Sequence, residues 1–236
     1  MQVMARNRRA FNADTVHTDK RKYFSPSSYL EFTVTLPAAL AHARGRLLDI
    51  GAGDIPYRSF FDGKVEAYLT LDHEERTTGI DFVADAQSLK GVIEPDSFDT
   101  VLMFHVLEHV PNPFRVADEI YRILRKDGAL ILSAPHFTRL HEQPYDFLRF
   151  TEFGLRHIFE SAGFRDIQVI PRGGFMSFLG HQASTFLICL TWHIPVVRTL
   201  AFLINKWLVV KPAVWLDSVT DKQKLFALSY VVVAKK

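Results

Sequence analysis

The chain has 236 residues, of which 48% are hydrophobic and 23% charged, so it suits one α/β domain with additions and a substantial buried core. Lysine and arginine number 28 against 26 aspartate and glutamate residues, a net charge of +2 that makes no electrostatic case for binding nucleic acid. The single cysteine, Cys189, excludes an internal disulfide framework and a cysteine-cluster zinc site, and we therefore expect a cytoplasmic protein.

The first 25 residues are polar and of mixed charge, which predicts a loose arm. Their arginines stand where a secretory signal would have an apolar core, so we expect no signal peptide. From residue 27 to 43 the sequence predicts a helix capped by Ser27 or Ser28. Residues 1–45 are thus expected to form an arm and a helix ahead of the main domain.

Short apolar runs then predict the strands of a sheet. They cover residues 46–50, 67–71, 80–84, 98–103, 129–133, 167–170 and 227–234. Helical stretches separate several of them, and this alternation favours a parallel sheet covered on both faces. Helices are predicted over residues 113–125 and 151–162 from the spacing of apolar residues. Thr151 should cap the second helix, and Gly163 should end it in the left-handed conformation.

The most informative segment joins the first predicted strand to a glycine turn, residues 47–53. Glycine lets a ligand approach the backbone closely because no Cβ stands in the way. The next strand ends in Asp72, about 20 residues on, where a carboxylate can accept hydrogen bonds from both hydroxyls of a ribose. These features predict a pocket for a nucleoside-containing cofactor.

The residues around the turn indicate which of two nucleoside-containing cofactors fits, a dinucleotide or a ligand with positive charge. A dinucleotide fingerprint needs a third glycine, and Pro56 stands in its place. Asp49 and Asp54 flank the turn, where they would repel a pyrophosphate but attract a ligand with positive charge. S-adenosylmethionine (SAM), with its sulfonium and ammonium groups, fits better. An ordinary strand, turn and helix without a ligand is the remaining alternative.

Several segments in this order resemble the class I SAM-dependent methyltransferases, in particular the group often called type 11. The matching segments are residues 48–53, Asp72, residues 82–86, residues 97–110 and residues 126–133. The resemblance implies an α/β fold: a Rossmann-like, seven-stranded, mostly parallel sheet with helices on both faces and an antiparallel last strand. The SAM-binding core would comprise residues 46–174 with 222–236.

The resemblance also implies which residues bind SAM. Asp72 would take the ribose diol and Asp85 the adenine amine, while His105 would lie beside the methionine part. The full set of implied contacts is Asp49, Gly51, Ala52, Gly53, Asp72, His73, Asp85, Ala86 and His105.

The segment from His105 to His109 has the spacing of an inverted zinc-protease signature, with Glu108 as its acid. It follows a strand of a nucleoside-binding fold, and no third ligand is evident, so we assign no metal site. Glu108 and His109 are expected to begin the next helix and to orient the loop. For His109, packing in the interior and contact with substrate are equally compatible with the sequence.

The loop after the fifth strand, residues 134–151, is the best candidate for the catalytic surface, because loops on a rigid scaffold carry function. A similar stretch is familiar from type 11 relatives linked with cell-surface polysaccharide synthesis. Its candidate catalytic residues are His136, His141, Tyr145, Asp146 and Arg149. Either histidine could be the base, with Asp146 as its orienting partner and Arg149 as a clamp for an acidic or phosphorylated acceptor. Alternatively, Asp146 and Arg149 form a structural pair that fixes the following helix.

Residues 175–221 are predicted to form an apolar helical insertion before the last strand. His193, Pro195 and Arg198 interrupt the apolar run before it reaches the about 20 residues that a spanning helix needs. Two amphipathic helices are therefore predicted. A lid, a homodimer interface and contact of residues 175–217 with an anionic membrane surface remain open.

These features predict an enzyme that moves a methyl group from SAM to an oxygen, less readily a nitrogen, of a small molecule or saccharide. The acceptor would be free or lipid-linked, and no nucleic acid partner is expected. The predicted location is the cytoplasm, with the inner face of the membrane as a variant of it. A non-catalytic methyltransferase-like scaffold and an NAD-type oxidoreductase are the alternatives from other classes.

Overall fold

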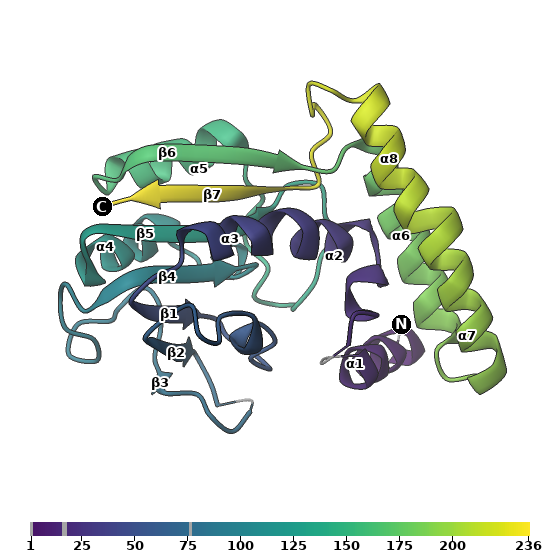
Figure 1. The fold of residues 1–236 in the computed structure, drawn as a ribbon, viewed down its shortest axis with the longest axis horizontal. Helices are drawn as coiled ribbons and strands as arrows, with labels where there is room; N and C mark the ends of the chain where they lie inside the picture. The colour runs from purple at the N-terminus through teal and green to yellow at the C-terminus, as the bar shows by residue number, and fades with distance from the viewer. Residues whose placement is uncertain (1, 16–17, 76) are drawn as a thin grey trace. The chain divides into compact units, whose positions relative to one another are not determined.

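The structure, a computed structural model, describes residues 2–15, 18–75 and 77–236 (Figure 1). They divide into two compact units, residues 1–36 with 172–228 and residues 37–171 with 229–236. We call the first the helical unit and the second the sheet unit. The expected N-terminal section, 1–45, is thus divided, and most of it belongs with the apolar insertion to the helical unit.

A seven-stranded sheet forms the core of the sheet unit, in the order β3-β2-β1-β4-β5-β7-β6 (Figure 1). The strands are β1 (Arg46–Ile50), β2 (Ala67–Asp72), β3 (Phe82–Val83), β4 (Phe98–Phe104), β5 (Leu124–Pro135), β6 (Arg165–Arg172) and β7 (Ser229–Lys235). β1 pairs in parallel with β2 and β4, β4 pairs in parallel with β5, and β7 runs antiparallel to β5. The predicted fold is confirmed, including the antiparallel last strand.

The strand order places the candidate site. From β1 the chain proceeds to β2 and β3 on one side and then returns to β4 on the other side of β1. Open α/β sheets bind ligands outside the carboxyl ends of the strands at such a switch point. The turn after β1, the end of β2 and the loop after β4 all lie at these ends.

The helices of the sheet unit begin and end close to where the sequence predicts. α4 (Pro113–Ile123) is capped by Asn112, and α5 (Glu152–Ser161) is capped by Thr151, whose Oγ1 accepts a hydrogen bond from the Gly154 amide at 3.1 Å. Gly163 follows α5 with a φ of 96°, the left-handed conformation that was expected.

One strand starts earlier than expected. β5 begins at Leu124, directly after α4, whereas the sequence predicted a strand from residue 129. Leu124 pairs with Phe98, and after an irregularity in register the regular ladder resumes at Ala129 opposite Thr100. The residues between Leu124 and Ala129 are polar or glycine, so a search for apolar runs does not detect this part of the strand.

The prediction of a loose N-terminal arm is wrong, because residues 2–15 form the helix α1 (Gln2–Thr15). Its buried residues, Asn7, Phe11 and Thr15, recur at intervals of four and so share one face. Phe11 packs against Trp192, with ring centroids 4.6 Å apart, and Asn7 Nδ2 donates to the carbonyl of Cys189 at 2.8 Å. Both of these partners lie more than 170 residues away, which local sequence does not reveal.

The predicted helix near residue 27 begins one residue earlier, at Pro26 of α2 (Pro26–Leu30). Its cap is Ser25, whose Oγ accepts from the Ser28 amide at 3.3 Å, and the expected caps Ser27 and Ser28 lie inside the helix. A π-helical turn, Glu31–Thr35, and α3 (Leu36–His42) follow.

A buried charge pair stabilises the helical unit. The Arg172 side chain is fully buried and donates through Nη1 to the carboxylate of Glu31 and the hydroxyl of Thr35. Removing one member of such a pair leaves an uncompensated charge, typically at a cost of about 3–5 kcal/mol.

The apolar insertion contains two long helical segments, as predicted. They are α6 (Phe175–Thr191) and a second run in which α7 (Pro195–Ile204), a π-helical turn (Asn205–Val210) and α8 (Lys211–Thr220) follow one another. The sequence predicted that the apolar run stays too short to span a membrane, but within the described residues the run Pro195–Thr220 is one helix that is long and apolar enough to do so by length and composition. The buried Asn205 on this run donates through Nδ2 to the carbonyls of Tyr23 and Phe24, so one of its sides packs inside the helical unit.

A buried carboxyl group lies in the middle of the sheet. Asp49 on β1 is 2% exposed, and the hydroxyl of Tyr68 on the neighbouring β2 donates to its Oδ2 at 2.5 Å. Burial raises the pKa of Asp49 to about 7, although the hydrogen bond from Tyr68 opposes the shift. The same contact and burial raise the pKa of Tyr68.

This raised pKa makes stability depend on pH. The folded protein holds the Asp49 proton up to about pH 7, whereas the unfolded chain releases it near pH 4, so stability from this group falls as the pH rises between them. In the variant Asp49→Asn the side chain at this position carries no charge at any pH. We expect the Tm of the variant minus that of the wild type to increase between pH 5 and pH 8 by on the order of 5 °C. Thermal melts of the ligand-free proteins measure this, and a difference that stays constant with pH contradicts the account.

Candidate active site

The turn after β1 requires glycine at its first position. Gly51 has a φ of 74°, and a Cβ built there would lie 2.1 Å from Cγ2 of Val106, a residue of the loop after β4. The amides of Gly51 and Ala52 donate to the carbonyl of Leu71 on β2, at 2.7 and 3.2 Å. The turn is therefore held between β2 and the loop that follows β4.

Asp72, the last residue of β2, lies against this turn. Its Oδ2 accepts from the backbone amide of Gly53 at 2.9 Å, and its Oδ1 accepts from the amide of His73 at 2.7 Å. Gly53 has a φ of 53°, and no described heavy atom lies within 4 Å of where its Cβ would be. The structure thus has a carboxylate beside a glycine turn whose far side is open.

These residues fit the adenosine part of SAM. Each carboxylate oxygen can accept more than one hydrogen bond, so Asp72 can accept from a ribose diol while it holds the Gly53 amide. The open face of Gly53 leaves room for a ligand to lie against the backbone. His73 Nδ1 lies 2.8 Å from Asp72 Oδ1, which orients the imidazole at the rim of the site.

The other proposed contacts are less uniform. Asp85 is exposed two residues after β3, and its Oδ1 accepts from the Gln87 amide at 2.9 Å, while Ala86 is buried. Asp49, by contrast, is buried beneath the turn, where its carboxyl group accepts a hydrogen bond from Tyr68. His105 follows β4 with a φ of 55° and a side chain that is 33% exposed.

The loop after β5 is held by Asp146 and Arg149. The sequence left open whether these two residues act on the acceptor or form a structural pair. Arg149 donates through Nη1 and Nη2 to the two oxygens of Asp146, at 2.6 and 2.8 Å. Its other N–H groups donate to the backbone carbonyls of Thr138, Arg139 and Leu148. All five donors of this guanidinium are therefore used within the loop, which supports the structural role and leaves none for clamping an acceptor.

Asp146 in turn fixes a histidine. Its Oδ2 accepts from the backbone amide of His141 at 2.9 Å and lies 3.4 Å from the same residue's Nδ1. The adjacent Arg149 guanidinium holds the pKa of Asp146 well below its usual range. His141 and its expected orienting partner are thus brought together.

The remaining loop candidates are Tyr145 and His136. Tyr145 is 62% exposed. His136, directly after β5, has its ring 5.7 Å from that of Tyr230 on β7, and its buried Nδ1 has no hydrogen-bond partner among the described residues.

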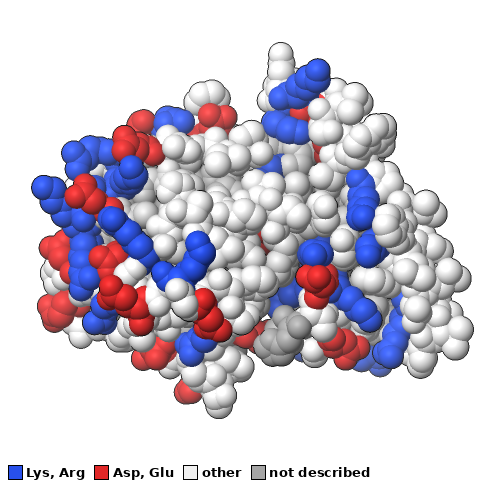
Figure 2. Space-filling view, viewed as in Figure 1, with Lys and Arg blue, Asp and Glu red and all other residues white. Residues whose placement is uncertain are grey.

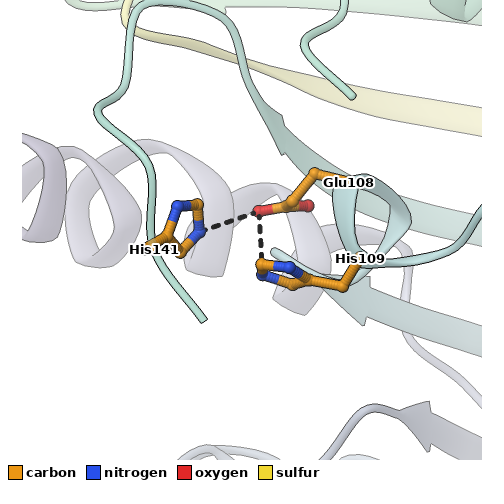
Figure 3. A group of neighbouring side chains, drawn as sticks. All are labelled: Glu108, His109 and His141. Atoms are coloured by element: carbon orange, nitrogen blue, oxygen red, sulfur yellow. Dashed lines mark ion pairs between the residues drawn. The ribbon is translucent and has the colours of Figure 1, made fainter. Parts of the chain in front are cut away.

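The prediction that Glu108 and His109 begin the next helix is wrong, because they form a separate short turn ahead of α4, which begins at Pro113. Glu108, in the 3₁₀ helix Leu107–His109 after β4, is completely buried. Its carbonyl accepts from the amides of Phe147 and Leu148, at 2.9 and 3.2 Å, so the loop after β5 is hydrogen-bonded directly to it. His141 from the loop after β5 lies beside Glu108 and His109, and the side-chain nitrogen and oxygen atoms of these three residues that could bind a metal lie within 4.8 Å of one another (Figure 3).

The charge of Glu108 is governed by the histidines around it. His105 Nδ1 and His141 Nε2 each lie 3.6 Å from Oε1, and His109 Nε2 lies 3.8 Å from it. Burial would raise the pKa of Glu108, but the neighbouring imidazoles outweigh burial and lower it to about 2. Glu108 is therefore an anion in a site without water contact.

Solved structures of other proteins share this fold. A SAM-dependent methyltransferase from Archaeoglobus fulgidus superposes with a TM-score of 0.53 at 18% identity, covering 88% of this chain and 98% of that one. Phosphoethanolamine N-methyltransferase 2 from Haemonchus contortus, in complex with phosphomonomethylethanolamine and S-adenosylhomocysteine, superposes with a TM-score of 0.58 at 18% identity, covering 96% of this chain and 59% of that one. At this identity the likeness establishes the fold.

Sequence comparison gives the family. An uncharacterized methyltransferase from Mycobacteroides abscessus is 30% identical over 107 residues, which cover 38% of this chain and 40% of the relative's length. The family model described as "Methyltransferase domain" matches residues 21–169. This match includes the glycine turn, Asp72 and the loops after β4 and β5, and it confirms the resemblance to class I SAM-dependent methyltransferases. The chain belongs to this methyltransferase domain family, whose enzyme class and methyl donor are those that the sequence predicted.

Proposed function

We propose that this protein binds SAM at the glycine turn and Asp72 and methylates a hydroxyl group of a small molecule or saccharide. The observation that carries the proposal is the contact of Asp72 with the Gly53 amide at the switch point of the sheet. When bound, SAM supplies a methyl group that its sulfonium has already activated. The protein then has to hold the acceptor in line and keep water away, and such positioning contributes on the order of 7–11 kcal/mol.

An oxygen acceptor must also lose a proton. His136 is our candidate for the base, because its buried Nδ1 has no hydrogen-bond partner among the described residues and it follows directly on β5. A positioned base of this kind contributes roughly 10²–10⁴-fold in rate. A nitrogen acceptor is the alternative, as in the Haemonchus contortus N-methyltransferase of the same fold.

Replacing Asp72 tests the site. A hydrogen bond to a charged group contributes about 1.5–3 kcal/mol, so Asp72→Ala should weaken SAM binding by about 10- to 100-fold. Asp62→Ala removes an exposed carboxylate from the loop before β2 and should leave the affinity unchanged. Calorimetric titration with SAM measures both variants. Equal affinity of Asp72→Ala and the wild type would refute the assignment, and a fluorescence response to NADH in place of SAM binding would favour an oxidoreductase.

We also propose that the helical unit contacts an anionic membrane surface, which would give access to a lipid-linked acceptor. α7, α8 and the π-helical turn between them expose large apolar side chains, and Figure 2 shows a largely uncharged surface over α7 and α8. Leu208 is 71% exposed and Trp207 is 54% exposed. Lys206 and Lys211 lie over the Trp207 ring, 5.1 and 3.8 Å from its centroid. Cations grouped with an aromatic side chain in this way suit the surface of an anionic membrane.

Vesicle binding distinguishes this proposal from a lid and from a dimer interface. We expect the protein to sediment with vesicles that contain phosphatidylglycerol, more weakly with neutral phosphatidylcholine, and less at high salt. Replacing Trp207 and Leu208 together by serine should weaken binding at least about 10-fold. The matched control is Phe153→Ser on α5, where the side chain is 79% exposed. Failure to bind either vesicle, or a stable dimer that the double replacement dissociates, would contradict membrane contact.

A further inference from the structure

The carboxylate of Glu108 is buried without a hydrogen bond. Neither Oε1 nor Oε2 has a hydrogen-bond partner within the described part of the chain, and the side chain is 0% exposed. Its nearest polar neighbours are the imidazole nitrogens at 3.6 to 3.8 Å from Oε1, beyond hydrogen-bond length. Burying an anion costs several kcal/mol unless a cation or donors compensate it, so such a site requires a positive charge.

The two histidines in Figure 3 are oriented by backbone carbonyls. His109 Nδ1 lies 2.7 Å from the carbonyl of Tyr145, and His141 Nδ1 lies 3.2 Å from the carbonyl of Arg139. A carbonyl can only accept, so in both residues Nδ1 carries the proton. Both rings then turn Nε2 toward Glu108 Oε1. A neutral ring presents the lone pair of this nitrogen to the carboxylate, and a cation bound between them makes that arrangement favourable, whereas a protonated ring would itself supply the positive charge.

We propose that Glu108, His109 and His141 bind a divalent transition-metal ion, with zinc as the best fit. Two imidazoles and one carboxylate are the ligands of many catalytic zinc sites, which keep a fourth position open. A carbonyl that fixes the distal nitrogen is the usual second shell of a metal-bound histidine. Ligand atoms of a tetrahedral zinc site lie about 3.3 Å apart. The atoms of the present group lie within 4.8 Å of one another, so binding of the ion would draw the two rings closer together.

The location of the ion suits the proposed methyl transfer, and its use there rests on that function. Val106, two residues before Glu108, packs on Gly51 of the glycine turn, so the metal ligands follow directly on a residue of the cofactor site. The open position of the ion would hold an acceptor through its oxygen and favour the deprotonated hydroxyl. An acceptor with a hydroxyl group that can ligate a metal is therefore the expected substrate class.

Zinc stoichiometry tests the site in the full-length, tag-free protein. The protein is stripped with a chelator, dialysed, and titrated with zinc against a chromophoric competitor, and bound metal is measured by mass spectrometry. We expect one zinc per chain in the wild type. His141→Ala and Glu108→Gln should each lower the affinity by about 100-fold or more, since loss of an outer-shell partner alone costs 10- to 100-fold. The control His157→Ala, on α5 outside the cluster, should bind as the wild type does.

Two results would overturn the proposal. One is a wild type that binds no zinc at concentrations that saturate ordinary zinc enzymes, in which case protonated imidazoles neutralise Glu108. The other is unchanged zinc affinity in both ligand variants, with circular dichroism showing that they are folded. A parallel titration with SAM distinguishes failure of the metal site from failure of the proposed methyltransferase function. Zinc binding without SAM binding would leave the metal site standing and refute the methyltransferase proposal, and SAM binding without zinc would do the reverse.

Discussion

The hydrogen bond from the Gly53 amide to Asp72 Oδ2, at 2.9 Å, joins the ends of β1 and β2, and the rest of the candidate site is arranged around it. It depends on a turn that only glycine can make at residue 51, because Val106 from the loop after β4 fills the place of a Cβ. The ends of three adjacent strands are thereby locked together at the switch point of the sheet. Whatever binds there meets a carboxylate and an open stretch of backbone in fixed relation, which is what recognition of a nucleoside requires.

The second half of the site is built by loops that hold one another. The loop after β5 is tied to Glu108 by two backbone hydrogen bonds and braced internally by the Asp146–Arg149 pair. Since Arg149 uses all five of its donors in that brace, the work of this pair is to fix the path of the loop and so the position of His141. The result is a buried anion facing two oriented imidazoles, an arrangement that is costly to maintain unless a cation completes it.

Much of this fold could be predicted from local sequence, because apolar runs, caps and a glycine turn act over a few residues. β1 and the end of β2 at Asp72 follow from such signals, and so does α5 with Thr151 and Gly163 at its ends. α1 could not be predicted, because Phe11 is the one buried apolar side chain among those of α1 that the structure describes, and it packs on Trp192, more than 170 positions away. The contact of His141 with Glu108 was equally hidden, since it depends on the path of the loop between β5 and α5, which is fixed by backbone hydrogen bonds that leave no pattern in the sequence.

The central claim is that the sugar of an adenosine lies between Asp72 and the turn after β1. A crystal structure of the protein with S-adenosylhomocysteine tests it most directly. The account predicts ribose hydroxyls within hydrogen-bond distance of the Asp72 carboxylate, with the nucleoside lying over the open face of Gly53. A complex in which the ribose contacts other residues, or in which the turn binds no nucleoside at saturating ligand, would contradict it.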